Sequence, residues 1–250
     1  MIGIIEWNNQ KWQVAFNHPL DISIAMENGS KNPNAFGIQP PAFEPFKAGS
    51  FIGSTALGGS VNCENLFLNP HGNGTHTECV GHISKERITI HETLQQFHFI
   101  AKLITVTPQF INGDFIITSD SLALLDWKGT EALIIRTHPN TIEKKTIQYS
   151  GNNPCYLAAD VCALLATNQI KHLVIDLPSV DREEDEGKLA AHHAFWNYPQ
   201  QKNNLSTITE MAYIDNAIED GLYLLNLQIA SLQTDASPSK PVLYKLQHVL

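Results

Sequence analysis

The distribution of apolar residues in the second half of the chain predicts several buried strands. Residues 98–109 and 130–138 are rich in β-branched side chains and are bounded by Gly, Asp or Pro, as buried strands commonly are. Residues 220–232 have the same apolar character and predict a long strand of the same sheet or of a partner sheet. Between the first two strands, residues 120–129 predict a short helical turn that ends at Gly129.

A helix followed by a strand is predicted further along the chain. Within residues 156–169, the apolar residues Leu157, Val161 and Leu164 recur every three or four positions, which indicates a helix with one apolar face. The continuous apolar run at residues 171–180 then predicts a buried strand. This unit is typical of an α/β layer, in which the ends of the strands and the loops after them carry the chemistry.

The first sixty residues differ in composition from the rest of the chain. They are rich in Gly, Pro and Asn, which suits loops between short strands, and residues 21–24 are the best early strand. No internal repeat occurs in the chain, and no linker rich in Pro, Gly or Ser separates parts of different composition. We therefore expect one domain over residues 1–250.

The charge of the chain argues against nucleic acid as a partner. A formal net charge of −9 comes with only 16 Lys and Arg, and Lys144 and Lys145 are the only adjacent basic pair. Binding to phosphates requires a basic face. With 43% hydrophobic and 16% charged residues, the composition indicates a folded globular protein.

The sequence also predicts a cytoplasmic location without a membrane span. No uninterrupted apolar stretch approaches the roughly 18 residues that a spanning helix needs, and the first residues lack the features of a secretory signal. The four cysteines contain no Cys-x-x-Cys pair, so reduced thiols are expected.

A dense group of possible metal ligands lies between Pro70 and His82. It consists of His71, His76, Glu78 and His82. Neutral imidazole and carboxylate groups suit zinc, manganese and iron, and the Gly-Asn-Gly turn within the group permits backbone conformations that aim side chains inward. The alternative is a set of scattered surface histidines. We interpret the group as a metal site.

The spacing within this group suggests different roles for its members. His76 and Glu78 are two residues apart, so in an extended segment both face the same side and chelate one ion. A metal with an open position activates water, and His82 beside it can relay a proton to a leaving group. This arrangement favours hydrolysis. The alternative for His82 is a structural histidine.

Several segments resemble one protein family. The segment PHGNGTHTECVGH at residues 70–82 resembles the signature His-x-Gly-Thr-His-x-Asp-x-Pro-x-His of the metal-dependent cyclase family, which includes bacterial kynurenine formamidases and isatin hydrolases. Four further segments are similar to family segments and follow the family's order: PLDISIAM at 19–26, VIDLPSVD at 174–181, AHHAFW at 191–196 and TEMAYID at 209–215. The resemblance spans nearly the whole chain.

The resemblance implies an α/β, single-domain swivelling β/β/α fold, with a mixed sheet and flanking helices, and a site for one or two divalent ions, Zn or Mn. It implies His82 as the catalytic histidine and the metal ligands His71, His76, Glu78, His192 and Glu210. The activity implied is that of a metal-dependent arylformamidase, which hydrolyses N-formylkynurenine to kynurenine and formate in tryptophan catabolism. The partner implied is therefore a small-molecule substrate, an aromatic amide. A homodimer or homotetramer is also implied, with residues near the N-terminus close to a neighbouring site.

Two of these ligands depart from the family pattern. His71 precedes His76 by five residues, whereas the family places its first histidine four before the second. Glu78 replaces the family's aspartate and is one methylene longer. Later in the chain, His193 stands beside His192 and leaves the register of that ligand open by one residue.

Aromatic residues near the site are candidates for holding a substrate ring. They are Phe43, Phe46, Phe51, Phe195 and Trp196, although aromatic side chains near strands are more often part of the core.

Other classes of enzyme lack their motifs in this chain. The sequence contains no Gly-x-Ser-x-Gly elbow, no Gly-x-Gly-x-x-Gly and no Gly-x-x-x-x-Gly-Lys. Cys79 follows Glu78 directly, so on a strand its thiol is expected to point to the opposite face and to be buried. Two alternatives stay open: a lactam or lactone hydrolase, cyclase or dehydratase of the same family, and a metal-dependent binding protein without turnover.

Overall fold

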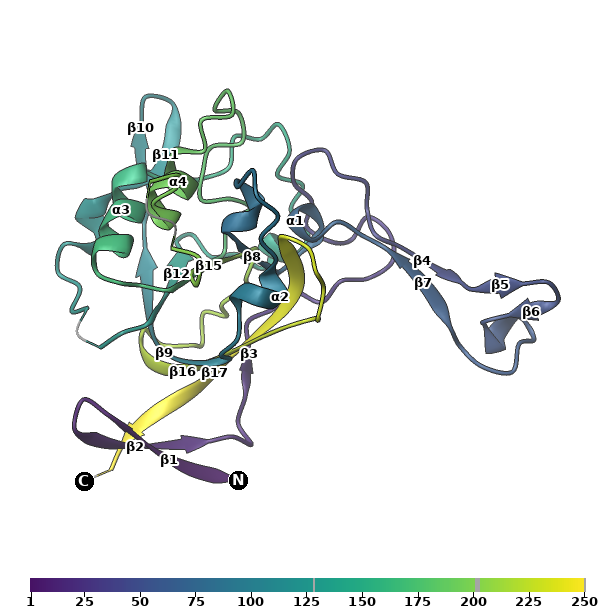
Figure 1. Cartoon of the computed structure of the whole chain (residues 1–250), viewed down its shortest axis with the longest axis horizontal. Helices are drawn as coiled ribbons and strands as arrows, with labels where there is room; N and C mark the ends of the chain where they lie inside the picture. The colour runs from purple at the N-terminus through teal and green to yellow at the C-terminus, as the bar shows by residue number, and fades with distance from the viewer. Residues whose placement is uncertain (128, 201–202, 250) are drawn as a thin grey trace.

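The computed structural model describes residues 1–127, 129–200 and 203–249, and its centre is a mixed sheet that closes on itself. Seven strands form the closed ring, because β8 pairs with β15 on one side and with β17 on the other (Figure 1). In ring order they are β17 (Ala236–His248), β16 (Gly221–Ile229), β9 (His98–Val106), β12 (Ala132–Thr137), β14 (His172–Ile175), β15 (Thr207–Glu210) and β8 (His76–Cys79).

The direction of the strands brings distant parts of the sequence to one end of the ring. Strands β9, β12, β14 and β15 run parallel, whereas β8 is antiparallel to both of its neighbours. As a result β8 begins where β15 ends, and His76 lies opposite Glu210. The loop that follows β14 leaves the sheet at this same end.

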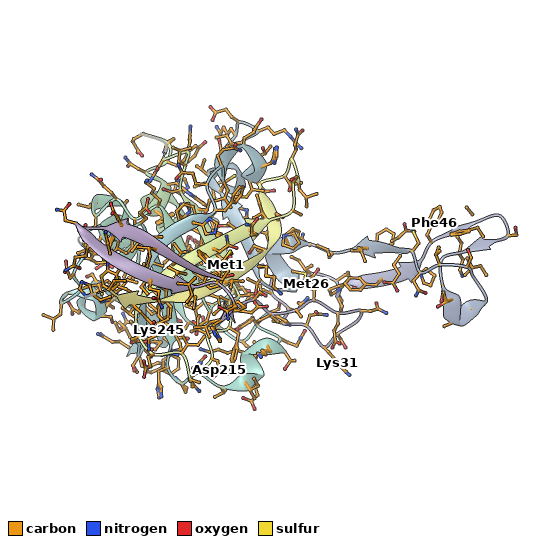
Figure 2. The ribbon with its side chains drawn as sticks, turned by 90° about the horizontal axis from the view of Figure 1, so that it is seen from below. Met1, Met26, Lys31, Phe46, Asp215 and Lys245 are labelled. Carbon is orange, nitrogen blue, oxygen red and sulfur yellow. The ribbon has the colours of Figure 1, made fainter. Side chains whose placement is uncertain are left out.

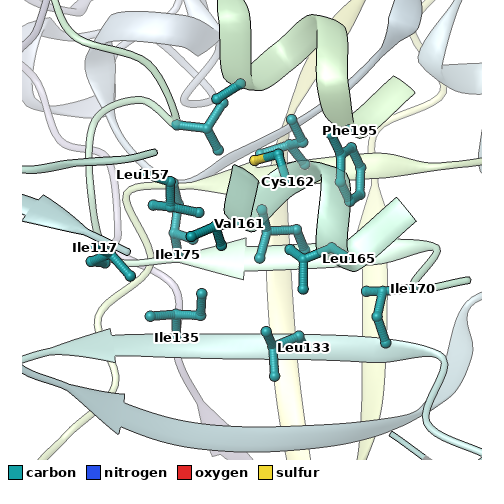
Figure 3. Packing of buried hydrophobic residues seen from close by; sticks show 14 of the residues in the cluster. Ile117, Leu133, Ile135, Leu157, Val161, Cys162, Leu165, Ile170, Ile175 and Phe195 are labelled. Atoms are coloured by element: carbon teal, nitrogen blue, oxygen red, sulfur yellow. The ribbon is translucent and has the colours of Figure 1, made fainter. Parts of the chain in front are cut away.

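Helices cover one face of the parallel strands. Helix α3 (Ala159–Thr167) packs on α4 (Ala190–Trp196), and both contribute to an apolar cluster against the sheet (Figure 3). Because side chains alternate along a strand, Leu133 and Ile135 of β12 face this cluster, while Ile134 belongs to a second cluster on the other face.

An N-terminal hairpin extends the sheet beyond the ring. Strands β1 (Ile2–Trp7) and β2 (Gln10–Ala15) are joined at Asn8 and Asn9, which have positive φ angles as hairpin turns require. Strand β2 pairs with the end of β17. The short β3 (Leu20–Asp21) pairs with the middle of the same strand.

A second hairpin projects far from the body of the molecule (Figures 1 and 2). We call residues 42–67 the arm. Its base is β4 (Ala42–Pro45) paired with β7 (Glu64–Phe67), and its outer part contains β5 (Lys47–Ala48) paired with β6 (Phe51–Ile52). Every residue of β7 is exposed.

The remaining elements are short. A small sheet contains β10 (Gln109–Ile111), β11 (Asp114–Ile117) and β13 (Tyr156–Leu157). The other α-helices are α1 (Pro70–Asn73) and α2 (Ile90–Thr93), and the 3₁₀ helices are η1 (Thr55–Leu57), η2 (Val80–His82), η3 (Ser119–Leu122) and η4 (Ile142–Lys145). Among the described residues, no helix is long and apolar enough to cross a membrane. All four cysteines are free.

The structure confirms the α/β class with its mixed sheet and flanking helices, and the longer predicted strands correspond to β9, β12 and β16. The predicted helix at 156–169 is shorter, because its first residues join β13. The predicted strand at 171–180 ends at Ile175.

Two shorter predictions were wrong in part. The expected strand at 21–24 ends at Asp21, because the Asp21 carboxylate accepts hydrogen bonds from the backbone and hydroxyl of Ser23 and turns the chain. The helical turn expected at 120–129 is limited to Ser119–Leu122, and position 128 lies outside the described residues.

Candidate metal centre

Two strands bring three of the predicted ligands together. On β8, His76 and Glu78 point to the same side, as their spacing predicts, and both are fully buried. Glu210 ends the neighbouring β15, and its Oε2 lies 3.4 Å from Nε2 of His76. The other oxygen of Glu210 accepts a hydrogen bond from the backbone N–H of Val180, which fixes the carboxylate.

His71 reaches the same place from α1. The side chain of Asn69 caps this single helical turn, and Gly74 continues the chain with a φ of 152°. In this way the additional residue between His71 and His76 is accommodated. Nδ1 of His71 lies 3.2 Å from Oε2 of Glu78, and its ring centroid is 5.2 Å from that of His76.

Helix α4 brings His192, and not its neighbour His193, to the same cluster. Nε2 of His192 lies 3.1 Å from Oε1 of Glu78, whereas His193 bonds to the carbonyl oxygen of Tyr198. The other nitrogen of His192 donates to Asp181 over 2.6 Å. Asp181 also accepts the backbone N–H groups of Ala191 and His192, so this carboxylate fixes both the helix start and the imidazole.

His82 lies at the open side of the cluster on η2. Its side chain is 30% exposed, and its ring stacks on that of His71 with centroids 4.4 Å apart. Nδ1 of His82 donates to Oδ2 of Asp235 over 3.3 Å. Its Nε2 has no hydrogen bond to any residue of the described ranges.

Asp235 is a member of the cluster that sequence reasoning missed. It precedes β17, and its Oδ2 also accepts a hydrogen bond from Nε2 of His71 over 2.9 Å. The backbone pairing of β17 with β8 positions it, because the N–H of Cys79 donates to the carbonyl of Asp235. No motif marks this residue in the sequence, and only the long-range strand pairing could have found it.

The donor atoms fit a divalent metal ion. His76 donates its Nδ1–H to the carbonyl oxygen of Gly74, which leaves Nε2 with a free lone pair. This Nε2 and Oε2 of Glu78 are buried and make no hydrogen bond in the described part of the chain, despite their close neighbours. Donor atoms of His71, His76 and Glu78 lie within 4.8 Å of one another. Buried nitrogen and oxygen atoms that have free lone pairs and no hydrogen bond are suited to bind a cation.

The protonation of the histidines reflects their carboxylate partners. Burial alone would lower the pKa of His71, but the contacts with Asp235 and Glu78 outweigh it and raise the pKa to about 10. Burial would also lower the pKa of His192, but its contacts with Asp181 and Glu78 outweigh this effect and raise the pKa to about 10. Hydrogen bonds from His71 and His82 hold the pKa of Asp235 well below its usual value. In the metal-free protein, protons therefore occupy positions that an ion would take.

A cavity of about 450 Å³ opens onto the cluster. His71, His82, His192 and Glu210 line its inner end, and Phe36 and the loop after β14 line its walls. Phe36 was not among the predicted aromatic residues.

The predicted aromatic residues lie elsewhere. Phe43, Phe46 and Phe51 belong to the arm, and Figure 2 shows Phe46 far from the body. Phe195 and Trp196 are completely buried in the core beneath α4, although the Trp196 ring lies 5.5 Å from that of His192. None of these five residues lines the cavity described above.

Cys79 behaves as expected from strand alternation. It is buried, and its side chain packs in the apolar cluster opposite the histidines. Burial raises the pKa of its thiol, which disfavours the thiolate that a nucleophile requires.

Comparisons with known proteins agree with this architecture. The model of the Cyclase family, described as "Putative cyclase", matches residues 16–182. The kynurenine formamidase of Bacillus mycoides (strain KBAB4) is 27% identical over 186 residues, which cover 74% of this chain and 81% of that protein.

Solved structures show the same fold at lower identity. Isatin hydrolase A from Ralstonia solanacearum has a TM-score of 0.68 and 13% identity, with 91% of each chain covered. A potential metal-dependent hydrolase with cyclase activity has a TM-score of 0.68 and 18% identity, with 91% of this chain and 97% of that chain covered. Because 91% of this chain is covered, the common fold extends past residue 182, where the family model ends.

Proposed function

Because the chain belongs to the Cyclase family, we propose that it is a metal-dependent hydrolase that cleaves a carbon–nitrogen bond in a small amide. The observation that carries this proposal is the convergence of buried, unsatisfied donor atoms with a more exposed histidine at the end of one cavity. Such a combination of possible ligands and a proton-transfer group is what metal-assisted hydrolysis requires.

The metal would be held by five side chains from four elements. They are His71, His76, Glu78, His192 and Glu210. Imidazole and carboxylate donors suit Zn or Mn, as one or two ions. When bound, such an ion supplies a Lewis acid that polarises a carbonyl group and lowers the pKa of water.

His82 is assigned as the general acid and base. In amide hydrolysis, the oxygen of water bonds to the carbonyl carbon, the carbon–nitrogen bond breaks, and the amine leaves with a proton. Nε2 of His82 takes the proton from water and gives it to the leaving nitrogen. Asp235 supports this role because it accepts the Nδ1–H of His82 and so directs Nε2 toward the cavity.

We further assign an aryl formamide as the substrate type, which gives an arylamine and formate. The similarity to kynurenine formamidases supports this reaction. Phe36, which is 42% exposed at the cavity wall, offers an apolar surface for an aromatic ring.

The arm supports a homodimer or homotetramer as the working form. Leu66 and Phe67 of β7 are 59% and 57% exposed, and a two-stranded hairpin alone in water is at best marginally stable. Burial of these side chains against a second copy of the chain would stabilise the arm. A cytoplasmic location is also proposed, and the four free cysteines favour it.

Elemental analysis of the purified protein, followed by assays with a formamide, lactam and lactone panel and the metal found, tests the proposal. Bound metal and formanilide hydrolysis that depends on His82 are expected. Turnover of only lactams or lactones would assign a different reaction to the site. Bound metal without any turnover would instead indicate a binding protein.

A further inference from the structure

The outer wall of the cavity is a run of charged residues in a fixed loop. Residues 182–186 read Arg-Glu-Glu-Asp-Glu, and all of them line the cavity. Asp185 accepts hydrogen bonds from the backbone N–H groups of Gly187, Lys188 and Leu189. Glu183 accepts another from the backbone of Gly151. These bonds hold the loop, so its carboxylates stay at the entrance.

Arg182, the positively charged residue of this wall, already interacts with other groups of the protein. Nε of Arg182 lies 3.1 Å from Oδ2 of Asp114, and its Nη1 donates to the carbonyl oxygen of Glu184. No other Lys or Arg of the described ranges lines the cavity. Lys188, which follows the wall in the same loop, is paired with Glu186 over 2.9 Å. A carboxylate on a ligand would therefore find no unpaired guanidinium or ammonium group there.

The inner end of the same cavity points independently to a ligand. Nε2 of His76 and Oε2 of Glu78 are fully buried without a hydrogen-bond partner among the described residues, directly behind His192 and Glu210. Glu78, Glu210 and the nearby Asp181 and Asp235 add four carboxylates to this region. Together with the four carboxylates of residues 183–186, these outnumber the two positive charges of one divalent ion and the four of two ions, so the entrance stays negative.

We propose that this site selects amides that are neutral or carry an ammonium group on the amine side, and that it discriminates against amides whose only charge is a carboxylate. This proposal rests on the proposed hydrolase function and specifies its substrate class. A cleft lined by one sign of charge concentrates ligands of the opposite sign and repels those of the same sign. Because that charge lies away from the reacting bond, the preference belongs in KM more than in kcat.

A set of three formanilides tests the preference. One is unsubstituted, one carries a meta aminomethyl group and one carries a meta carboxymethyl group, so that a methylene separates each charge from the ring. With metal-loaded protein at about 0.05 M NaCl, we expect kcat/KM for the cationic compound to exceed that for the anionic one by roughly 10- to 100-fold. At about 0.5 M NaCl the ratio should shrink strongly, because salt screens exposed charges.

Charge-neutral variants assign the effect to the loop. In Glu183→Gln/Glu184→Gln/Glu186→Gln, the amide oxygen at 183 can still accept the bond from Gly151, and Asp185 is retained. This variant should keep the neutral substrate's kcat and lose most of the preference. The matched control is Glu131→Gln, a partly exposed carboxylate at the opposite end of the parallel strands, which should keep the preference. Equal turnover of all three compounds by the wild-type protein, or an unchanged preference in the triple variant, would overturn the proposal.

A binding measurement separates this proposal from the proposed reaction. Calorimetric titration of the metal-loaded protein with the cationic and anionic anilines, the products of those formanilides, requires no turnover. Tighter binding of the cationic aniline that is lost in the triple variant supports the charge selection even if no formanilide is hydrolysed. Equal or tighter binding of the anionic aniline contradicts it, whatever the protein does to formamides.

Discussion

Glu210 lies across from His76 in the antiparallel pairing of β15 with β8, and their side chains approach to 3.4 Å. One residue ends a strand near the C-terminal part of the chain, and the other begins a strand in its first third. Their position is therefore set by backbone hydrogen bonds of the sheet. The two proposed ligands are therefore preorganised for metal binding.

We expect His76→Ala and Glu78→Ala to lose most of the bound metal, because each change removes a donor from a buried site. Elemental analysis after gel filtration measures this loss. Circular dichroism should show that the fold is retained. Full metal content in either variant would show that these residues are not ligands.

The adjacent histidines His192 and His193 on α4 allow a matched pair of variants to be compared. His192→Ala should reduce metal content, whereas His193→Ala should retain it, since only His192 contacts Glu78 and Asp181. The same elemental analysis applies to both proteins. Equal metal content in the two variants would exclude His192 as a ligand.

His82→Ala should retain metal and lose turnover by about 10²- to 10⁴-fold, the usual contribution of a general acid or base. The measurement is kcat for formanilide alongside metal content. A variant that retains both would restrict His82 to a structural role.

Asp235→Asn should lower kcat more than it raises KM, because the amide no longer holds His82 as an anionic acceptor does. Steady-state kinetics with formanilide measure both parameters, and metal content measured on the same protein separates this positioning role from a purely structural one, since the metal should be retained. An unchanged kcat would indicate that Asp235 acts only on the backbone.

The metal-free protein should become less stable as the pH rises from about 6.5 to about 10. His71 and His192 each have a pKa of about 10 when folded, against about 6.5 in an unfolded chain. The stability from their protonated contacts is fully present below pH 6.5 and is lost as the pH rises through the folded value. Thermal unfolding after chelation tests this, with the metal-loaded protein as the control. A flat profile for the metal-free protein across that range would contradict it.

The sequence predicts the candidate metal ligands better than it predicts the residues that surround them. The spacing of His76 and Glu78 is local, so strand alternation is sufficient to place both side chains together. Asp235 depends on the pairing of β17 with β8, and Phe36 depends on the path of a loop. Local periodicity in a sequence does not indicate long-range contacts of this kind, which is why sequence reasoning missed both residues.

The same distinction applies to the fold. Long apolar runs predict β9, β12 and β16 because burial on both faces leaves a clear signal. Helix α4 was missed because residues 181–193 begin with acidic residues and lack helical spacing, although Ala191, Phe195 and Trp196 are buried. The one-domain organisation and the roles of the site residues remain predictions.

The strand that carries His76 and Glu78 is also the strand that closes the ring, since β8 joins β15 to β17. A folding intermediate in which β8 has not docked would have neither a complete barrel nor a complete set of donors. Metal binding is therefore expected to come late in folding. An ion bound to the complete site would stabilise the pairing of β8 with β15 and β17 against opening.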